Sequence, residues 1–204
     1  MAHIAIYGGS FNPIHLGHTS LAESILQLGI FDEVWLMPTP LNPHKQDERT
    51  TIAPFHHRLT MAQLATRGVP SLRVTDYEAL LPQPTYTSNT LAFLRRDYSQ
   101  HRFSLLIGED NWQSFPHWHN PQQIRDSHDI AVYSRTGNAL LPASLTLYRS
   151  GEEQGEVLSS CLRTFPISST VLRNAISQGD FPLLQRWLHP DVLSYIQHHR
   201  LYQL

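Results

Sequence analysis

Two histidines near the start of the sequence stand three positions apart in a segment that could bind phosphate. The segment is GGSFNPIHLGH, residues 8–18, and it directly follows a short apolar run. Gly8 and Gly9 carry no Cβ, so a ligand can approach the backbone closely. A helix beginning near His15 would present unpaired N–H groups and a partial positive charge to an anion. His15 and His18 would then share one helix face, and we predict a phosphate site here.

This segment differs from other phosphate-binding loops. The sequence contains neither G-x-x-x-x-G-K-[ST] nor G-x-G-x-x-G, and Ser10 does not stand in a G-x-S-x-G elbow. A lone His-x-x-His pair is more often part of a helix end packed on a sheet. The glycines before it and the Asn-Pro turn favour phosphate binding instead.

A second segment, far along the chain, could also hold an anion. Ser168 is a good N-cap for a helix over 168–177, and the next residues would carry free N–H groups. Arg173 would lie one turn further along, within reach of the same anion. Taken alone, this pattern equally fits an ordinary capped helix.

The composition indicates one globular domain. The 204 residues are 41% hydrophobic and 16% charged, which is enough for a core without disulfides. Cys161 is the single cysteine, so no intrachain disulfide can form and we expect a cytoplasmic protein. The first residues lack a basic leader, and no apolar stretch approaches about 18 residues, so we expect no signal peptide and no membrane association. The net charge of −2 argues against binding long nucleic acids.

Strand-like and helix-like segments alternate along most of the chain. This alternation predicts a parallel sheet covered by helices on both faces, a Rossmann-like three-layer α/β/α fold with ligands outside the carboxyl ends of the strands. Residues 136–157 show no clean period, and we expect them to include a variable loop. We expect one domain over 1–204, with an α/β core over about 1–160 and a small helical part over 161–204. The expected strands are 3–9, 33–38, 71–76, 103–108 and 129–134, and the expected helices are 16–28, 54–67 (with Leu59, Ala62 and Leu64 as core), 87–98, 168–177 and 190–199.

Both phosphate-binding candidates resemble the signature of one enzyme group. Residues 9–18 match the nucleotidyltransferase superfamily named for its His-x-Gly-His motif, and ISSTVLR at 167–173 matches its Ser-Ser/Thr-x-x-Arg box. Within that superfamily the chain most resembles the bacterial nicotinate-nucleotide adenylyltransferases. The further matching stretches are PHK at 43–45, TYTSNTL at 85–91, GEDNWQSFPHW at 108–118 and PDVLSYIQHHRLY near the end.

The resemblance implies an enzyme that transfers the adenylyl group of ATP to nicotinate mononucleotide, forming nicotinate adenine dinucleotide and pyrophosphate in NAD biosynthesis. It implies Mg²⁺ bound mainly through the ATP phosphates, with no protein ligand assigned. The partners would be ATP and nicotinate mononucleotide, without nucleic acid or membrane, and a homo-oligomer is left open. Histidine pairs such as 56–57 and 198–199 lack the partners and spacing of a zinc site, so we expect them to be solvated.

The resemblance also assigns roles to single residues. His15, His18 and Arg173 would be catalytic. The residues at ATP would be Gly8, Gly9, Ser10, Phe11, His15, His18, Gly108, Asp110, Ile167, Ser169, Thr170 and Arg173. The residues at the mononucleotide would be Asn12, Lys45, Thr87, Trp118 and Arg135.

Several alternatives remain open at this stage. Asp110 could instead cap a helix, Lys45 could be a solvated loop cation, and Trp118 could belong to the core. Asn12 stands where many relatives carry Asp, and His119 follows the tryptophan where an aromatic residue is common. The acceptor could be nicotinamide mononucleotide or pantetheine phosphate. The protein could also be a non-catalytic nucleotide-binding module, or, more remotely, a hydrolase that uses the single cysteine.

Overall fold

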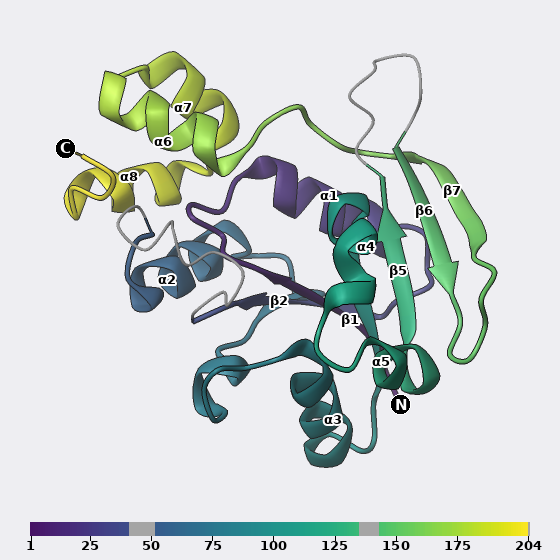
Figure 1. Ribbon diagram of the computed structural model, residues 1–204. Helices are drawn as coiled ribbons and strands as arrows, with labels where there is room; N and C mark the ends of the chain where they lie inside the picture. Colours follow the sequence, from purple (N-terminus) through teal and green to yellow (C-terminus); the bar gives the residue numbers. More distant parts are fainter. Residues whose placement is uncertain (41–51, 135–142, 204) are drawn as a thin grey trace.

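The computed structural model describes residues 1–40, 52–134 and 143–203. In this part of the chain, seven strands form one sheet in the order β3-β2-β1-β4-β5-β6-β7 (Figure 1). Strands β1 to β5 run parallel, whereas β6 and β7 are antiparallel to their neighbours. The bounds are β1 (His3–Gly9), β2 (Glu33–Pro38), β3 (Leu72–Val74), β4 (Arg102–Gly108), β5 (Asp129–Tyr133), β6 (Ala143–Tyr148) and β7 (Glu156–Leu162).

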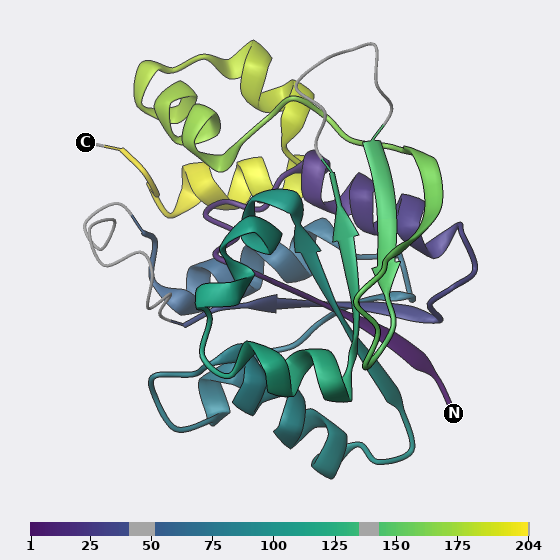
Figure 2. The same ribbon diagram turned by 45° about the vertical axis from the view of Figure 1, so that its right-hand side comes forward.

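Helices cover both faces of the sheet, and the predicted α/β fold is confirmed (Figures 1 and 2). One face carries α1 (Leu16–Leu26), α2 (Phe55–Ala65), α6 (Ser169–Gln178), α7 (Phe181–Trp187) and α8 (Pro190–His198). The other carries α3 (Thr87–Asp97), α4 (Glu109–Ser114) and α5 (Pro121–Ser127), with the short 3₁₀ turns η2 (Tyr77–Leu80) and η3 (Phe115–His117). No helix in the described ranges is long and apolar enough to cross a membrane.

The central strands are buried on both sides, as parallel strands usually are. In β1, Ala5 and Tyr7 pack toward α1 and α2, while Ile4 and Ile6 pack toward α3 and α5. The chain forms β2 and β3 on one side of β1 and then returns to form β4 on the other side. The strand order therefore reverses between β1 and β4, and ligands of such sheets bind at the carboxyl ends of these strands.

Residues 136–157 were expected to include a variable loop, and their described part contains β6 and the start of β7, two strands that the sequence analysis did not predict. Along β6 the side chains alternate between buried and half-buried positions, since only one face meets the core. Every second residue is then polar or partly exposed, and the short apolar run that marks a central strand is missing. The strand predicted at 71–76 covers only residues 72–74.

The inward face of α2 also differs from the prediction. Ala62 is buried as expected, but Leu59 and Leu64 are only half-buried. Met61 and Arg58 occupy the inner positions, and Arg58 is 1% exposed. A long charged side chain thus occupies an inner position where the sequence pattern favoured leucine, and it donates hydrogen bonds to main-chain carbonyls there.

Candidate active site

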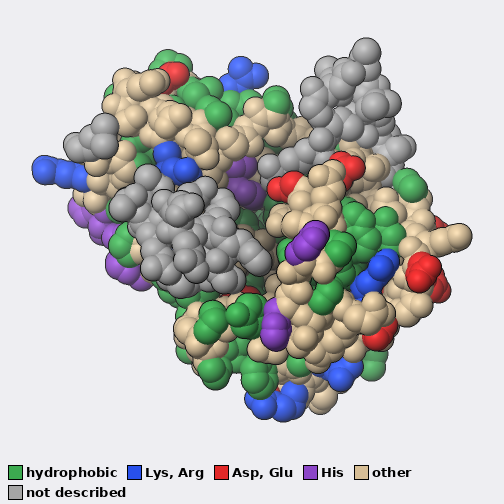
Figure 3. Space-filling model, viewed as in Figure 1, with side chains coloured by type: hydrophobic (Ala, Val, Ile, Leu, Met, Phe, Trp, Pro, Cys, Tyr) green, Lys and Arg blue, Asp and Glu red, His purple; other side chains and the backbone are tan. Residues whose placement is uncertain are grey.

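A cavity of about 620 Å³ opens at the carboxyl ends of β1 and β4, where the strand order reverses. Its wall includes the ends of four neighbouring parallel strands together with the N-termini of α1 and α6. Figure 3 shows the molecular surface hollowed between the C-terminal helices and the region of α4, with histidine side chains inside the hollow. The cavity lies where the fold predicts a ligand.

The two histidines of the N-terminal turn stack on each other at the start of α1. Their ring centroids are 3.8 Å apart with an interplanar angle of 27°, and the backbone N–H of His15 donates to Nδ1 of His18 at 3.3 Å. The ring of Phe11 meets the His18 ring edge to face, with ring centroids 5.1 Å apart, and the centroid of the Tyr7 ring lies 6.2 Å from that of His18. The His18 imidazole is therefore held by aromatic neighbours before any ligand arrives, which is the preorganisation that charge stabilisation requires.

Gly17 permits the close packing around His15. A Cβ on this residue would lie 2.9 Å from Nδ1 of His15 and 3.0 Å from Cγ2 of Ile167. Ile167 itself belongs to the core, is 7% exposed and is not part of the cavity wall. Its side chain packs against the beginning of α1, and its predicted place at ATP stays a prediction.

The start of α6 is hydrogen-bonded directly to the N-terminal turn. Oγ of Ser169 donates to the carbonyl of Pro13 at 2.9 Å, and Nη1 of Arg173 donates to the carbonyl of Asn12 at 2.8 Å. Nη2 of Arg173 also contacts Oγ1 of Thr170 at 3.2 Å. The two segments singled out by the sequence thus meet at one cavity.

The helix begins as predicted. Oγ of Ser168 accepts a hydrogen bond from the backbone N–H of Val171 at 3.3 Å, and this contact caps α6. The cap fixes the first turn of the helix, whose free N–H groups form a favourable anion site. Ser168, Ser169, Thr170 and Arg173 all line the cavity.

Arg58 lies behind the N-terminal turn and binds three main-chain carbonyls. Its Nε donates to Ala53 at 2.9 Å, Nη1 to Ser10 at 2.7 Å and Nη2 to Pro40 at 3.2 Å. These carbonyls belong to the turn after β1, the segment after β2 and the segment before α2. Burial lowers the pKa of Arg58, and the carbonyls satisfy its donors.

Asn12 connects the same turn to the segment that follows the last helix. Its Oδ1 accepts hydrogen bonds from the backbone N–H of Ala53 at 3.0 Å and from the hydroxyl of Tyr202 at 2.8 Å. The residue is 2% exposed. The sequence analysis missed both Arg58 and Tyr202, because a pattern of residue types does not indicate a hydrogen bond to a group far away in the sequence.

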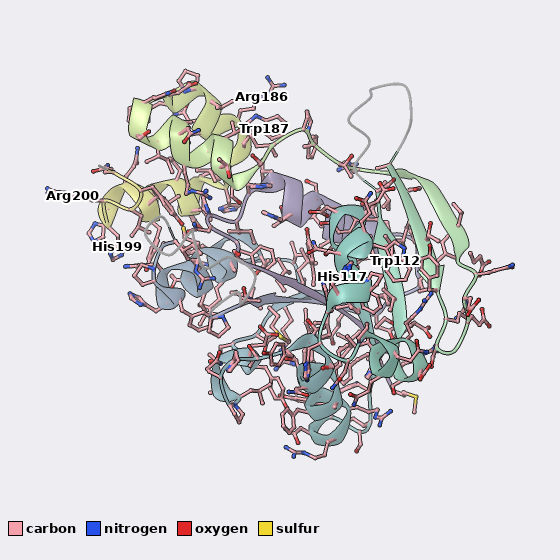
Figure 4. All side chains as sticks on the ribbon, in the orientation of Figure 1. Trp112, His117, Arg186, Trp187, His199 and Arg200 are labelled. Atoms are coloured by element: carbon pink, nitrogen blue, oxygen red, sulfur yellow. The ribbon has the colours of Figure 1, made fainter. Side chains whose placement is uncertain are left out.

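The other end of the cavity is lined by aromatic rings. Thr87 begins α3, and Trp118 follows η3 and is half-buried on the cavity wall. His119 stacks on Tyr86 with ring centroids 4.2 Å apart and an angle of 26°. His119 therefore still presents an aromatic plane where an aromatic residue was expected. His117, labelled in Figure 4, lies on the same wall after α4.

A buried carboxyl group also faces this part of the cavity. Glu78 is 8% exposed, and its Oε1 accepts a hydrogen bond from Oγ1 of Thr90 at 3.1 Å. Burial raises the pKa of Glu78 to about 7, and the hydrogen bond from Thr90 lowers it only in part. The sequence carried no signal for this residue, which lies in a short 3₁₀ turn.

Gly108 and Asp110 join the end of β4 to α4 and line the cavity. Gly108 is the N-cap residue of α4, and Asp110 lies in the first turn rather than at the cap. A Cβ on Gly108 would collide with the Asp110 carboxylate and approach the ring of Tyr133 to 3.2 Å. Only glycine therefore leaves the carboxylate of Asp110 in this position.

Most of the predicted site residues surround this one cavity, and their individual roles stay predictions. Lys45 and Arg135 lie outside the described residues, as does the side chain of Cys161. Within the described residues, no group of three or more His, Cys, Asp or Glu side chains is arranged to hold a metal ion. The predicted residues on the wall are Gly8, Gly9, Ser10, Phe11, Asn12, His15, His18, Thr87, Gly108, Asp110, Trp118, Ser169, Thr170 and Arg173.

Comparison with known proteins gives consistent matches over nearly the whole chain. A family model described as cytidylyltransferase-like matches residues 6–175. A probable nicotinate-nucleotide adenylyltransferase of Bacteroides fragilis is 39% identical over 191 residues, which cover 94% of this chain and 89% of that protein. One with the same name from Flavobacterium johnsoniae is 36% identical, with 98% of each chain covered.

Solved structures share the fold. The nicotinic acid mononucleotide adenylyltransferase of Plasmodium falciparum, complexed with NaAD, superposes with a TM-score of 0.74 at 19% identity, covering 99% of this chain and 98% of that one. A putative nicotinate-nucleotide adenylyltransferase from Vibrio parahaemolyticus gives a TM-score of 0.69 at 21% identity, covering 100% and 96%.

Proposed function

The chain belongs to the nicotinate-nucleotide adenylyltransferases of the cytidylyltransferase-like family, and from that premise we propose that it transfers the adenylyl group of ATP to nicotinate mononucleotide. The products are nicotinate adenine dinucleotide and pyrophosphate, in a step of NAD biosynthesis. The observation that carries the proposal is the direct contact between the N-terminal turn and α6. The carbonyl of Asn12 and the guanidinium of Arg173, 161 positions apart, meet at 2.8 Å beside the histidines.

The reaction brings two anionic substrates together, and the site must reduce the electrostatic repulsion between their phosphates. A phosphate oxygen of the mononucleotide attacks the α-phosphorus of ATP in line, and the bond to the bridging oxygen of pyrophosphate breaks. Two unit charges 4 Å apart repel by about 1 kcal/mol in water and about 4 kcal/mol at an effective dielectric constant of 20. Catalysis therefore depends on positioning and on donors that neutralise the phosphates, without a protein nucleophile.

We assign the triphosphate to the end of the cavity where α1 and α6 begin. His15 and His18 contact the phosphates, with His18 nearest the charge that develops on the transferred group. Ser169, Thr170 and Arg173 hold the β- and γ-phosphates, supported by the capped N-terminus of α6. Gly8 and Gly9 give the ligand access to the backbone, and a Cβ on Gly8 would meet nothing within 4 Å, which leaves room there.

The nicotinate ring is assigned to the aromatic end of the cavity. Trp118 offers a plane for stacking on the pyridine ring, and Thr87 lies at the N-terminus of α3 on the same wall. Gly108 and Asp110 are assigned to the ribose of adenosine. Lys45 and Arg135 are proposed as further phosphate contacts from outside the described residues.

Mg²⁺ is proposed as the metal that accompanies ATP. The ion prefers phosphate oxygens and water to closed protein cages. The proposal therefore assigns the ion to the triphosphate and names no protein ligand for it. Bound there, it supplies charge neutralisation on the phosphates.

We further propose that residues 1–204 act as one domain in the cytoplasm. The C-terminal helices share one hydrophobic core with β1, α1 and α2, so they are part of the same folded unit. The proposal assigns no nucleic acid and no membrane as partners, and it leaves the oligomeric state open.

The decisive test compares acceptors. Purified protein is incubated with ATP and Mg²⁺ and with either nicotinate mononucleotide or nicotinamide mononucleotide, and pyrophosphate and dinucleotide are measured. We expect the acid to give the larger kcat/KM. A clear preference for the amide would overturn the substrate assignment, and no product with either would overturn the enzymatic one.

Replacing His18 by Ala distinguishes an enzyme from a protein that only binds nucleotides. Because no other group is assigned to the developing charge, we expect turnover to fall by about 100-fold or more while the protein stays folded. The fold is checked by circular dichroism and the melting temperature. Turnover close to that of the wild type would contradict the catalytic role and favour a non-catalytic nucleotide-binding module.

A further inference from the structure

The side chain of Asn12 is the point at which the last part of the described chain touches the phosphate-binding turn. Its backbone carbonyl accepts from Arg173, and its Oδ1 accepts from Tyr202 and from the backbone of Ala53. Asn12 is thus held by Arg173, which is assigned to ATP, and by Tyr202, which has no assigned role in the proposed reaction.

Tyr202 is built to donate this hydrogen bond. It follows α8, and its ring packs against the hydrophobic core. Burial raises the pKa of its phenol, although the charges of Arg58 and Arg173 oppose the change. The hydroxyl therefore keeps its proton and donates to Oδ1 of Asn12 at 2.8 Å.

Arg58 fixes the same turn through a second route. Its guanidinium holds the carbonyl of Ser10 on one side of the turn and that of Ala53 on the other. The backbone N–H of Ala53 returns to Oδ1 of Asn12. The turn, α2 and the residue after α8 form one connected network behind the cavity, and Tyr202 closes it.

We propose that Tyr202 is a positioning residue for adenylyl transfer. It acts through Asn12 and keeps the phosphate-binding turn and the guanidinium of Arg173 in fixed positions relative to each other. The inference rests on the proposed function. Because the guanidinium of Arg173 is hydrogen-bonded to the main-chain carbonyl of Asn12, a shift of that carbonyl would also shift the guanidinium. A displacement of about 1 Å of a catalytic group can lower the rate by about 100-fold. The hydrogen bond from Tyr202 restricts this movement without touching a substrate.

The chain offers a matched control for the test. The hydroxyl of Tyr195 in α8 bonds Nδ1 of His57 at 2.9 Å, so Tyr195→Phe removes a similar hydrogen bond from the same helical region. Neither Tyr195 nor His57 lines the cavity. His199, labelled in Figure 4, follows α8, and its ring also packs on Tyr195 at 4.2 Å.

The experiment measures kcat and KM for each substrate with the wild type, Tyr202→Phe and Tyr195→Phe, at a temperature at which all three are folded by circular dichroism. We expect Tyr202→Phe to lower kcat/KM for ATP by about fivefold to tenfold, the size of one neutral hydrogen bond. The KM for nicotinate mononucleotide should change by less, because Arg173 and the two histidines of the turn are assigned to ATP, whereas Asn12 alone in the turn was predicted at the mononucleotide. Tyr195→Phe should retain wild-type values for both substrates. Equal kinetics of the two variants would overturn the proposal.

A double-mutant cycle tests the route through Asn12. If Tyr202 acts through that side chain, Tyr202→Phe should have no further effect in the Asn12→Ala background. Additive losses would contradict the proposed route. The affinity for a non-hydrolysable ATP analogue is measured in parallel; Tyr202→Phe should weaken it, whereas Tyr195→Phe should leave it unchanged. Should the wild type form no dinucleotide, the proposed function fails, while the analogue affinities still decide the role of Tyr202.

Discussion

The carboxyl group of Glu78 should make the stability of the protein depend on pH in a predictable direction. Glu78 is buried beside the cavity, and burial raises its pKa from the ordinary 4.5 to about 7. Between these pH values the folded protein holds a proton that the unfolded chain has released. The free energy of unfolding should therefore fall as the pH rises from about 4.5 to about 7, and this contribution should be constant on either side.

The magnitude follows from the size of the pKa change. A difference of about 2.5 pH units, at about 1.4 kcal/mol per unit, corresponds to about 3 kcal/mol. Replacing Glu78 by Gln removes the titration and keeps an oxygen that can accept from Thr90. Relative to the wild type, the variant should thus gain about 3 kcal/mol between pH 4.5 and pH 8. For a chain of this size that gain corresponds to about 6–12 °C in melting temperature.

The assay is urea unfolding of both proteins at pH 4.5 and pH 8, followed by circular dichroism. The quantity of interest is the difference between variant and wild type at each pH, because it cancels all other titrating groups. Glu153→Gln, which changes an exposed carboxylate in the turn before β7, controls for the loss of one surface charge. A difference between Glu78→Gln and the wild type that is the same at both pH values would refute the reasoning.

Two further substitutions test the surroundings of the proposed phosphate site. Gly17→Ala should lower kcat/KM for ATP by about tenfold or more, since the new Cβ would lie 2.9 Å from Nδ1 of His15 and displace its ring; unchanged steady-state kinetics would show that the ring tolerates the shift. Arg173→Lys should lower kcat/KM by about 10- to 100-fold, because an ammonium cannot bind the carbonyl of Asn12 and a phosphate with a fixed fork. Arg186→Lys, on the exposed side of α7 (Figure 4), is the matched control, and equal losses in both variants would contradict the assignment.

The parts of the fold that sequence patterns predicted are those with a clear period or a continuous apolar run. The central strands β1 and β4 are buried on both faces, so each contains a run of consecutive apolar residues, Ile4 to Tyr7 and Leu105 to Ile107. In β6 apolar residues alternate with polar ones over six positions, which is the pattern of a half-buried strand, and the sequence analysis did not recognise it. Helices α4 and α7 span six and seven residues, which is too short for a helical period to emerge.

The candidate site shows the same division. His15 and His18, and Arg173 at the other end of the chain, were recognised because local spacing and capping carry a signal within a few residues. Arg58 and Tyr202 bind groups 48 and 190 positions away, and a pattern of residue types along the chain does not encode such pairs. The roles assigned to the recognised residues stay predictions until substrates are tested.

The junction between the N-terminal turn and α6 has a consequence for how the protein is made. Asn12 and Arg173 are separated by 161 positions, so a ribosome that adds about 5–20 residues per second needs about 8–30 s to deliver the second after the first. During that interval the carbonyl of Asn12 lacks its guanidinium partner, although Ala53 and Arg58 are already available to hold the turn. The proposed ATP site is therefore complete only after α6 has left the ribosomal exit tunnel, and chains interrupted earlier should gain less protection from proteases when ATP is added.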